Sequence, residues 1–429
     1  MTDEEQFRRG PRSVSEITLS HICSLLRDVA LSTPSLWTSI HIDAASSSLG
    51  RVTEYVKRSG ACPLDLRIEL VEADMRSAER ELDPVFDLVV GHSLRWRSLS
   101  AECLRERSDR PIIARIGDSP AKALQHLSLD VEDVEQADAS AIDREIGFPH
   151  IFKEGTPNLK FVRLRGLAIQ LFRPPLDAVT TLHLEQTRRV PIALSTFQAI
   201  VTRSSSLAHL SVHGDIIGNT PWPRDNNAIH LPGLVSLRIC GESGNIYSGL
   251  LLGIRAPLLE SLTLKDVQEH DLDPLWDSAS PAQFINLRQL VFTNFELSSS
   301  TYKRLLDTFQ EVTSFSAVRS SISESPLVKA LMRETPWESD SHHMPWPNLT
   351  ILAFSLGDEE SDEEAIQELL EMREEQGLPL PKIRLRVDAE EMPEENFEDD
   401  NDRIELFFQD ETWPPNSNYV DDDDVLFSL

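Results

Sequence analysis

Apolar residues recur through the middle of this chain in the pattern L-x-x-L-x-L or a near copy of it. Each unit has a first apolar residue, a middle one three positions later and a last one two positions after that. Ten such units occur, with middle residues 20 to 37 positions apart. These middle residues are Leu99, Leu127, Val162, Leu182, Leu210, Leu237, Leu262, Leu290, Phe315 and Leu352.

The spacing predicts an α/β fold of the leucine-rich-repeat solenoid type. The middle and last apolar residues share one face of a short strand, because they lie two apart, and the first residue packs against the turn that enters it. One strand alone cannot bury that face, but stacked parallel neighbours can, with the strands on the concave side. Residues 195–204 and 301–310 have helical spacing and are expected on the convex side.

The segment before the repeats predicts a small helical cap. Its apolar residues recur at steps of three and four, which indicates a buried helical face. Pro34 ends the helix, and Trp37, Ile40 and Ile42 predict a first short strand. The apolar residues of the expected buried face are Ile22, Leu25, Leu26, Val29 and Ala30.

An eleventh unit is predicted near the C-terminus. Ile366, Leu369 and Leu370 mark a helix that ends at Gly377, and the alternation of Ile383, Leu385 and Val387 predicts a strand. We therefore expect a helical segment at 1–42, a solenoid at 43–387 and an acidic, largely disordered tail at 388–429.

Charge is concentrated at the C-terminus. The 429 residues carry a net charge of −30. Residues 357–429 hold 26 acidic and 5 basic side chains, a balance of −21, which leaves −9 for residues 1–356. Such a balance argues against nucleic acid and anionic membranes as partners, which both need Lys and Arg. With no secretory leader and no apolar span, a soluble intracellular protein is expected, cytoplasmic or nuclear.

Sequence motifs for chemistry are not found. The four cysteines lie far apart without a C-x-x-C pair, which argues against a disulfide framework and a zinc site. Phosphate-binding loops, nucleophile elbows and H-E-x-x-H helices do not occur. His209 and His213 would lie about 13 Å apart on a strand, too far to share an ion. We expect no metal, no cofactor and no catalytic residue.

The stretches "SHICSLLRDVALSTPSLWTSI", "VTEYVKRSGACPLDLRI" and "APLLESLTLKD" resemble F-box-like proteins with degenerate leucine-rich repeats, which are numerous in mushroom-forming fungi. Leu26 departs from the family, which usually has Trp there. The resemblance implies a substrate receptor that docks on the Skp-type adaptor of a cullin ubiquitin ligase and holds a protein substrate. The residues that carry it include His21, Cys23, Arg27, Asp28, Pro34 and Trp37.

Residues 1–13 supply neither the Leu-Pro step nor the L-x-x-I-F helix with which an F-box normally starts. Two alternatives follow: the natural protein is longer at this end, or adaptor binding has been lost. A plain leucine-rich-repeat scaffold without ligase association therefore remains the alternative function.

Residues that alternate with the buried ones should face a partner. We name nine of them the partner strip and hypothesise that it receives an acidic or phosphorylated segment. An ordinary solvated sheet face is the alternative. The acidic tail, with its apolar islands "IELFF" and "VLFSL", is expected to screen this strip, or else only to keep the protein in solution. The partner strip is Phe161, Arg163, Arg165, His183, Glu185, His209, His213, Arg238 and Lys265.

Overall fold

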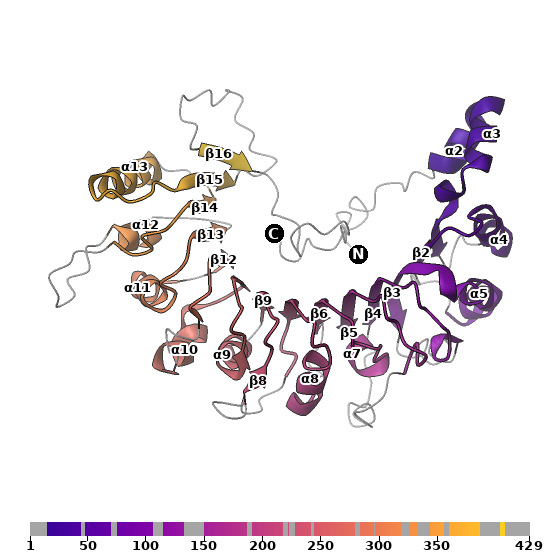
Figure 1. Cartoon of the computed structure of the whole chain (residues 1–429), viewed down its shortest axis with the longest axis horizontal. Helices are drawn as coiled ribbons and strands as arrows, with labels where there is room; N and C mark the ends of the chain where they lie inside the picture. Colours follow the sequence, from indigo (N-terminus) through magenta and orange to yellow (C-terminus); the bar gives the residue numbers. More distant parts are fainter. Residues whose placement is uncertain are drawn as a thin grey trace. The chain divides into compact units, whose positions relative to one another are not determined.

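The protein divides into two units, Met1–Val179 and Thr180–Leu429, and each is described by itself. In each unit, a layer of parallel strands carries helices along one side (Figure 1). The structure is a computed structural model, and it describes residues 15–43, 48–69, 75–105, 115–132, 150–186, 191–217, 222, 228–241, 244–278, 284–295, 297–318, 326–332, 344–355, 360–386 and 404–407.

The first unit is a parallel sheet in which the strands follow chain order. Its strands are β1 (Ser39–Asp43), β2 (Leu64–Glu69), β3 (Trp96–Arg105), β4 (His126–Glu132) and β5 (Phe161–Gly166). Its helices are α2 (Ser15–Ile22), α3 (Ser24–Ser32), α4 (Leu49–Arg58), α5 (Met75–Val90) and α7 (Ala168–Leu171), with 3-10 turns η1 (Pro34–Trp37) and η2 (Ser93–Arg95).

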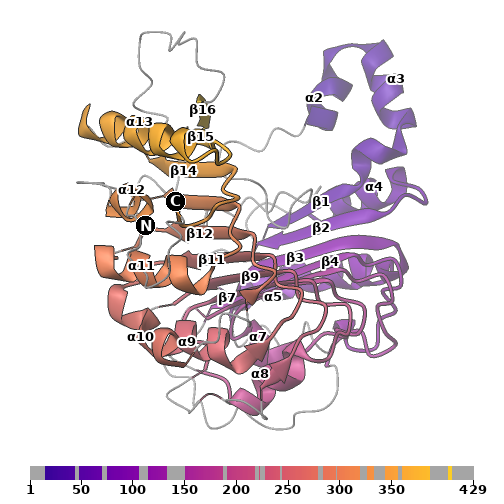
Figure 2. The ribbon, with the colours of Figure 1, turned by 60° about the vertical axis from the view of Figure 1, so that its left-hand side comes forward.

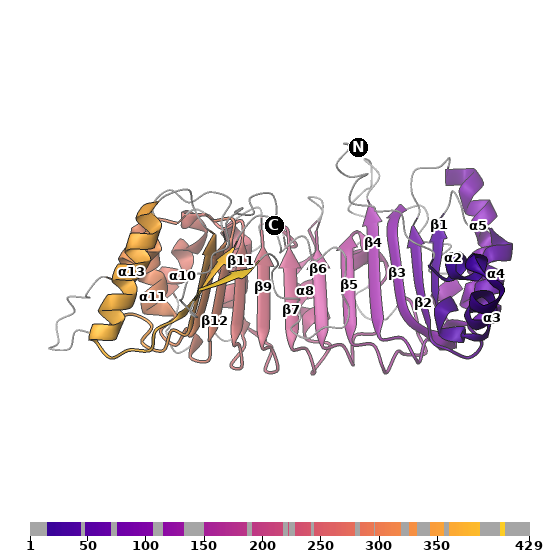
Figure 3. The ribbon, with the colours of Figure 1, turned by 90° about the horizontal axis from the view of Figure 1, so that it is seen from above.

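The second unit repeats this arrangement and has a 16-residue helix near its C-terminus (Figure 3). Its sheet contains β6 (Thr181–Glu185), β7 (His209–His213), β9 (Ser236–Cys240), β11 (Ser261–Lys265), β12 (Gln289–Thr293), β13 (Ser314–Val318), β14 (Ile351–Ser355), β15 (Lys382–Arg386) and β16 (Ile404–Phe407). The two-residue strands β8 (Ile229–His230) and β10 (Ile254–Arg255) pair with each other. Its helices are α8 (Leu194–Val201), α9 (Gly244–Gly253), η5 (Glu269–Leu272), α10 (Asp273–Ser278), α11 (Ser299–Thr308), α12 (Pro326–Leu331) and α13 (Glu360–Glu375).

The middle apolar residues of the repeats stack in one register, which confirms the predicted solenoid. Leu99, Leu127 and Val162 are Cα partners in the first unit, and all three are buried. The second unit has a row of its own in constant register, and its members are Leu182, Leu210, Leu237, Leu262, Leu290, Phe315, Leu352 and Ile383. In each unit this apolar row is the core that no single repeat can form alone.

The predicted eleventh unit is also present. Helix α13 covers the predicted apolar positions and ends before Gly377, which has φ +67° and donates its N–H to the carbonyl of Glu374. Strand β15 then follows. The fully buried Arg373 on α13 donates to the carbonyl oxygens of Pro379, Trp346 and Pro347 at 3.1 to 3.2 Å, so it ties the helix to the turn that enters β14.

The ends of several strands share a feature that the sequence analysis did not include. Gly166 is the last residue of β5, Gly214, Asp266 and Asn294 directly follow β7, β11 and β12, and all four have positive φ. Gly, Asp and Asn are the residues that adopt this left-handed conformation most readily. The chain therefore leaves these strands through the same tight bend, which turns it towards the helix layer.

The N-terminal helices differ from expectation. The apolar segment is not one helix, because Cys23 interrupts it and its sulfur caps α3 by accepting the N–H of Leu26 at 3.5 Å. Within this segment Ala30 is buried, but Ile22, Leu25 and Val29 are 62%, 70% and 50% exposed. The predicted buried face is therefore wrong for these three side chains.

Candidate functional site

The described chain offers two candidate surfaces, the face of the sheet opposite the helices and the exposed side of the N-terminal helices. The repeat pattern places the residues of the first surface outside the core, whereas those of the second were expected to be buried. The partner strip has residues in both units and so consists of two parts. Phe161, Arg163 and Arg165 belong to β5 of the first unit, and the second unit holds His183, Glu185, His209, His213, Arg238 and Lys265.

The β5 part of the strip is less accessible than its sequence suggests. Phe161 and Arg163 are each only 7% exposed, since neighbouring strands in register crowd them. The ring of Phe161 lies 5.9 Å from that of His126 on β4. Arg165 is more open, and its Nη1 lies 3.4 Å from a carboxylate oxygen of Asp130. An acidic ligand would therefore have to compete with a carboxylate already beside Arg165.

Next to this part lies a charge network that sequence reasoning missed. Arg67 on β2 contacts the carboxylates of Glu69 and Glu102 at 3.1 and 2.9 Å, and Nε2 of His41 on β1 lies 3.1 Å from Glu69. All four residues occupy the alternating positions of β1 to β3, and this alternation was the available signal. The sheet face of the first unit thus carries both signs of charge in contact.

In the second unit, too, charged side chains of the strip lie beside groups that can carry the opposite charge. Glu185 is only 4% exposed, and its carboxylate lies 3.3 Å from Nδ1 of His213 on the next strand. Burial, and to a lesser extent the charge of Arg238, lowers the pKa of His209, so that this imidazole is neutral at pH 7. Two basic groups of the strip, Arg165 and His213, therefore lie beside carboxylates, and His209 adds no positive charge at pH 7.

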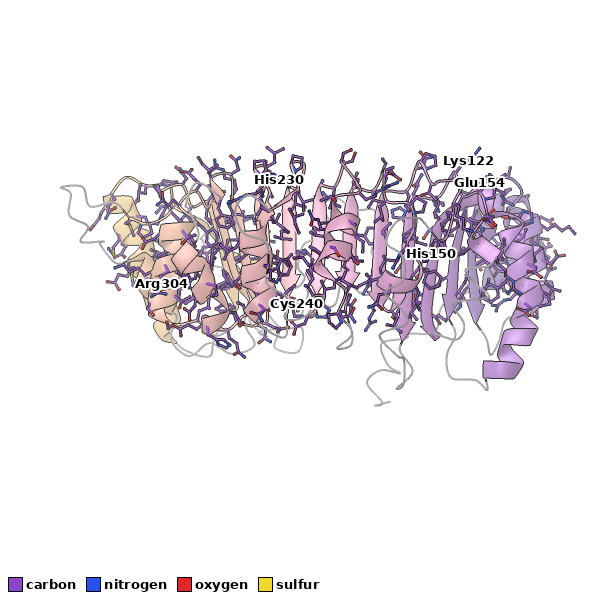
Figure 4. All side chains as sticks on the ribbon, turned by 90° about the horizontal axis from the view of Figure 1, so that it is seen from below. Lys122, His150, Glu154, His230, Cys240 and Arg304 are labelled. Atoms are coloured by element: carbon purple, nitrogen blue, oxygen red, sulfur yellow. The ribbon has the colours of Figure 1, made fainter. Side chains whose placement is uncertain are left out.

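Glu185, His213 and Cys240 occupy equivalent positions on β6, β7 and β9, an order that invites comparison with a cysteine nucleophile and its base. Cys240 lies at the edge of the second unit where the strands end (Figure 4). Its thiol donates to the Asp266 carboxylate at 3.3 Å. Burial and then this carboxylate raise the pKa of the thiol, so it stays protonated at neutral pH. The arrangement therefore favours a structural thiol.

The residues of the F-box-like resemblance come together in the N-terminal helices, where α2 and α3 lie side by side (Figure 2). Nε1 of Trp37 donates to the carbonyl of Ala30 at 2.8 Å, and the Arg58 guanidinium lies 4.4 Å above its ring. Arg27 donates to the carbonyl of Ser20 at 2.8 Å. Trp37 and Arg27 thus hold this segment together from within.

The other four residues of the F-box-like resemblance lie on the surface of this segment. Cys23 caps α3, and Pro34 is the first residue of η1. His21 and Asp28 are exposed. We name the three exposed side chains of Ile22, Leu25 and Val29 the apolar patch.

No group of three or more His, Cys, Asp or Glu side chains in the described ranges is placed to hold a metal ion. None of the described helices is both long and apolar enough to cross a bilayer. Comparison with known proteins adds no relative, because no family model matches this chain and no curated protein matches it.

Proposed function

We propose that this protein is a protein-recognition module, an F-box-like substrate receptor of a cullin-type ubiquitin ligase that acts as a scaffold. The observation that carries the proposal is the apolar patch. Eight large apolar side chains are exposed among the described residues, and four of them lie within residues 22–31. Exposed apolar groups gathered on one element mark interaction sites in soluble folds, whereas scattered ones do not.

In this proposal, the apolar patch contacts the Skp-type adaptor and the sheet face contacts the substrate. The patch suits a helix-in-groove contact, because Leu25 and Val29 lie four residues apart on α3 and are both exposed. The N-terminal helices are fixed to the first repeat through Trp37, so an adaptor bound there would hold the sheet in a defined orientation. The ubiquitin chemistry would belong to the partners.

The test is a binding measurement with a purified fungal Skp-type adaptor and the full chain carrying Leu25→Asp and Val29→Asp. Burying a Leu or Val side chain contributes about 1.5 to 3 kcal/mol, so losing both should weaken binding at least about tenfold. The matched control carries Leu94→Asp and Leu258→Asp, two side chains that are 57% and 51% exposed elsewhere in the chain.

The control variant should bind the adaptor as the natural chain does. Equal loss in both double variants would show that the apolar patch is not the docking surface. If the natural chain binds no adaptor at all, the receptor proposal fails and the plain scaffold remains.

A further inference from the structure

The last strand of the sheet comes from the acidic end of the chain. Strand β16 pairs in parallel with β15, with Ile404 opposite Ile383 and Leu406 opposite Leu385. Residues 388–429 carry 16 acidic and 1 basic side chains, a balance of −15. The first four residues of the apolar island "IELFF", Ile404–Phe407, thus pair part of this acidic end with the sheet.

Strand β15 offers alternating apolar and basic side chains to a strand that pairs with its edge. Ile383 and Leu385 are 1% and 7% exposed and continue the apolar core. The alternating residues Lys382 and Arg384 contact one carboxylate oxygen of Glu405 at 3.0 and 3.1 Å. A strand on this edge is therefore selected to be apolar, acidic and apolar in succession, which is the order Ile404, Glu405, Leu406.

Several features make β16 replaceable. It is the last strand in the sheet order, so its departure leaves the row from β6 to β15 intact. It has four residues, and both contacts of Glu405 involve partly exposed side chains, for which ion pairs are weak. Seventeen residues, 387–403, separate it from β15. Sheet edges bind added strands through backbone hydrogen bonds, with side-chain pockets giving the specificity.

We propose that the edge of β15 is a docking site for an extended acidic segment of a partner protein, and that β16 occupies this site within the free chain. The partner segment has the pattern apolar, acidic, apolar and displaces β16. Charge complementarity carries this choice of partner, because Lys382 and Arg384 select a carboxylate at the central position. The proposal is independent of adaptor docking and uses a different part of the chain.

The probe is a fluorescein-labelled peptide with the sequence of residues 401–409, NDRIELFFQ, and the readout is fluorescence anisotropy with the full-length protein. Leu406→Pro removes a backbone N–H from β16 and so empties the edge. If β16 occupies the edge about 90% of the time, the variant should bind the peptide about tenfold more tightly than the natural chain. Glu405→Lys keeps the backbone of β16 and provides a second variant, which should also bind more tightly.

Charge reversal locates the peptide. A peptide with Lys in place of Glu should bind the Leu406→Pro protein at least about fivefold more weakly, and adding Lys382→Glu should remove that preference, because Arg384 is then the one cation left beside the new carboxylate. Arg288→Glu, in the turn before β12, is the control and should leave the preference unchanged. A scrambled peptide, NDRFLEIFQ, should bind weakly.

Equal affinity of the natural chain and both β16 variants would overturn the proposal. So would a Lys-containing peptide that binds as well as the Glu-containing one. Dimers of the natural chain, seen by light scattering and dissolved by the peptide, would instead assign the edge to a second copy of this chain and would overturn the assignment to a partner protein.

Discussion

Replacing Gly214 with Ala tests whether the bend at the strand ends holds β6, β7 and β9 in register. Gly214 follows β7 with φ +77°, and its N–H donates to the carbonyl of Cys240 at 2.7 Å. A Cβ added at this position would overlap the carbonyl oxygen of Gln186, just after β6. Because that oxygen belongs to the backbone, it cannot rotate aside as a side chain would.

Two costs should add in the Gly214→Ala protein. The left-handed backbone costs a residue with a Cβ about 1 to 2 kcal/mol. Displacing the Gln186 backbone resembles overpacking of a core, which costs about 1 to 3 kcal/mol. The sum is about 2 to 5 kcal/mol. Gly377 is the matched control, since it has φ +67° and no atom within 4 Å of an added Cβ, so Gly377→Ala should cost only the first term.

Hydrogen exchange on the full chain measures both positions separately, which matters because repeat arrays open locally. Amides of β7 and β9 should exchange about 30-fold to several thousand-fold faster in Gly214→Ala, as 1.4 kcal/mol corresponds to a factor of ten. Amides near the end of α13 should exchange about 5- to 30-fold faster in Gly377→Ala. If the two variants lose the same free energy within about 0.5 kcal/mol, the Gln186 carbonyl does not constrain the bend and the reasoning is refuted.

Two further substitutions probe the buried guanidinium of Arg373 and the half-buried imidazole of His209. Arg373→Lys should lower the free energy of unfolding by about 2 to 4 kcal/mol in urea titrations, because an ammonium cannot reach all three carbonyl oxygens, whereas the exposed Arg304→Lys should change it by less than about 0.5 kcal/mol. Burial and Arg238 lower the pKa of His209, so the unfolded chain binds this proton more readily and stability should fall as the pH drops below about 6.5. His209→Gln should flatten that fall between about pH 7 and 5, and an unchanged slope would contradict a half-buried, neutral imidazole; the exposed His230→Gln is the control.

The repeat pattern predicted the fold because its signal is physical and local. Each strand must bury two apolar residues two positions apart, and the next repeat repeats this requirement. Strand β2 escaped the count because Pro63 stands where the pattern has its first apolar residue, before Leu66. Conversely, Trp37 takes that first position for β1 as Trp96 does for β3, so β1 is the earliest described repeat. Trp96 also donates to the carbonyl of a residue seven positions earlier, as Trp37 does.

The N-terminal helices show what periodicity leaves undecided. A step of three and four identifies one face of a helix, but not whether another element covers that face. Here the small residue Ala30 meets Trp37, which lets η1 approach α3 closely, and the larger Ile22, Leu25 and Val29 lie on the open side. Size therefore separates the two sides of this segment better than hydrophobicity does. The same separation makes the apolar patch a candidate surface.

The predicted charge of the partner strip was incomplete for a different reason. Charges were counted at chosen positions of each strand, and the carboxylates on the neighbouring strands were left out. In a parallel sheet with constant register, the neighbour of a side chain comes from the next strand, here 28 to 35 residues away in sequence for the two pairs of the strip. Asp130 beside Arg165 and Glu185 beside His213 are such neighbours. A partner on this face must exchange contacts that already exist, so net attraction contributes little and the positions of paired groups decide what binds. The edge of β15 follows the same rule, except that there the existing contact comes from the chain's own acidic end and can be exchanged as one strand.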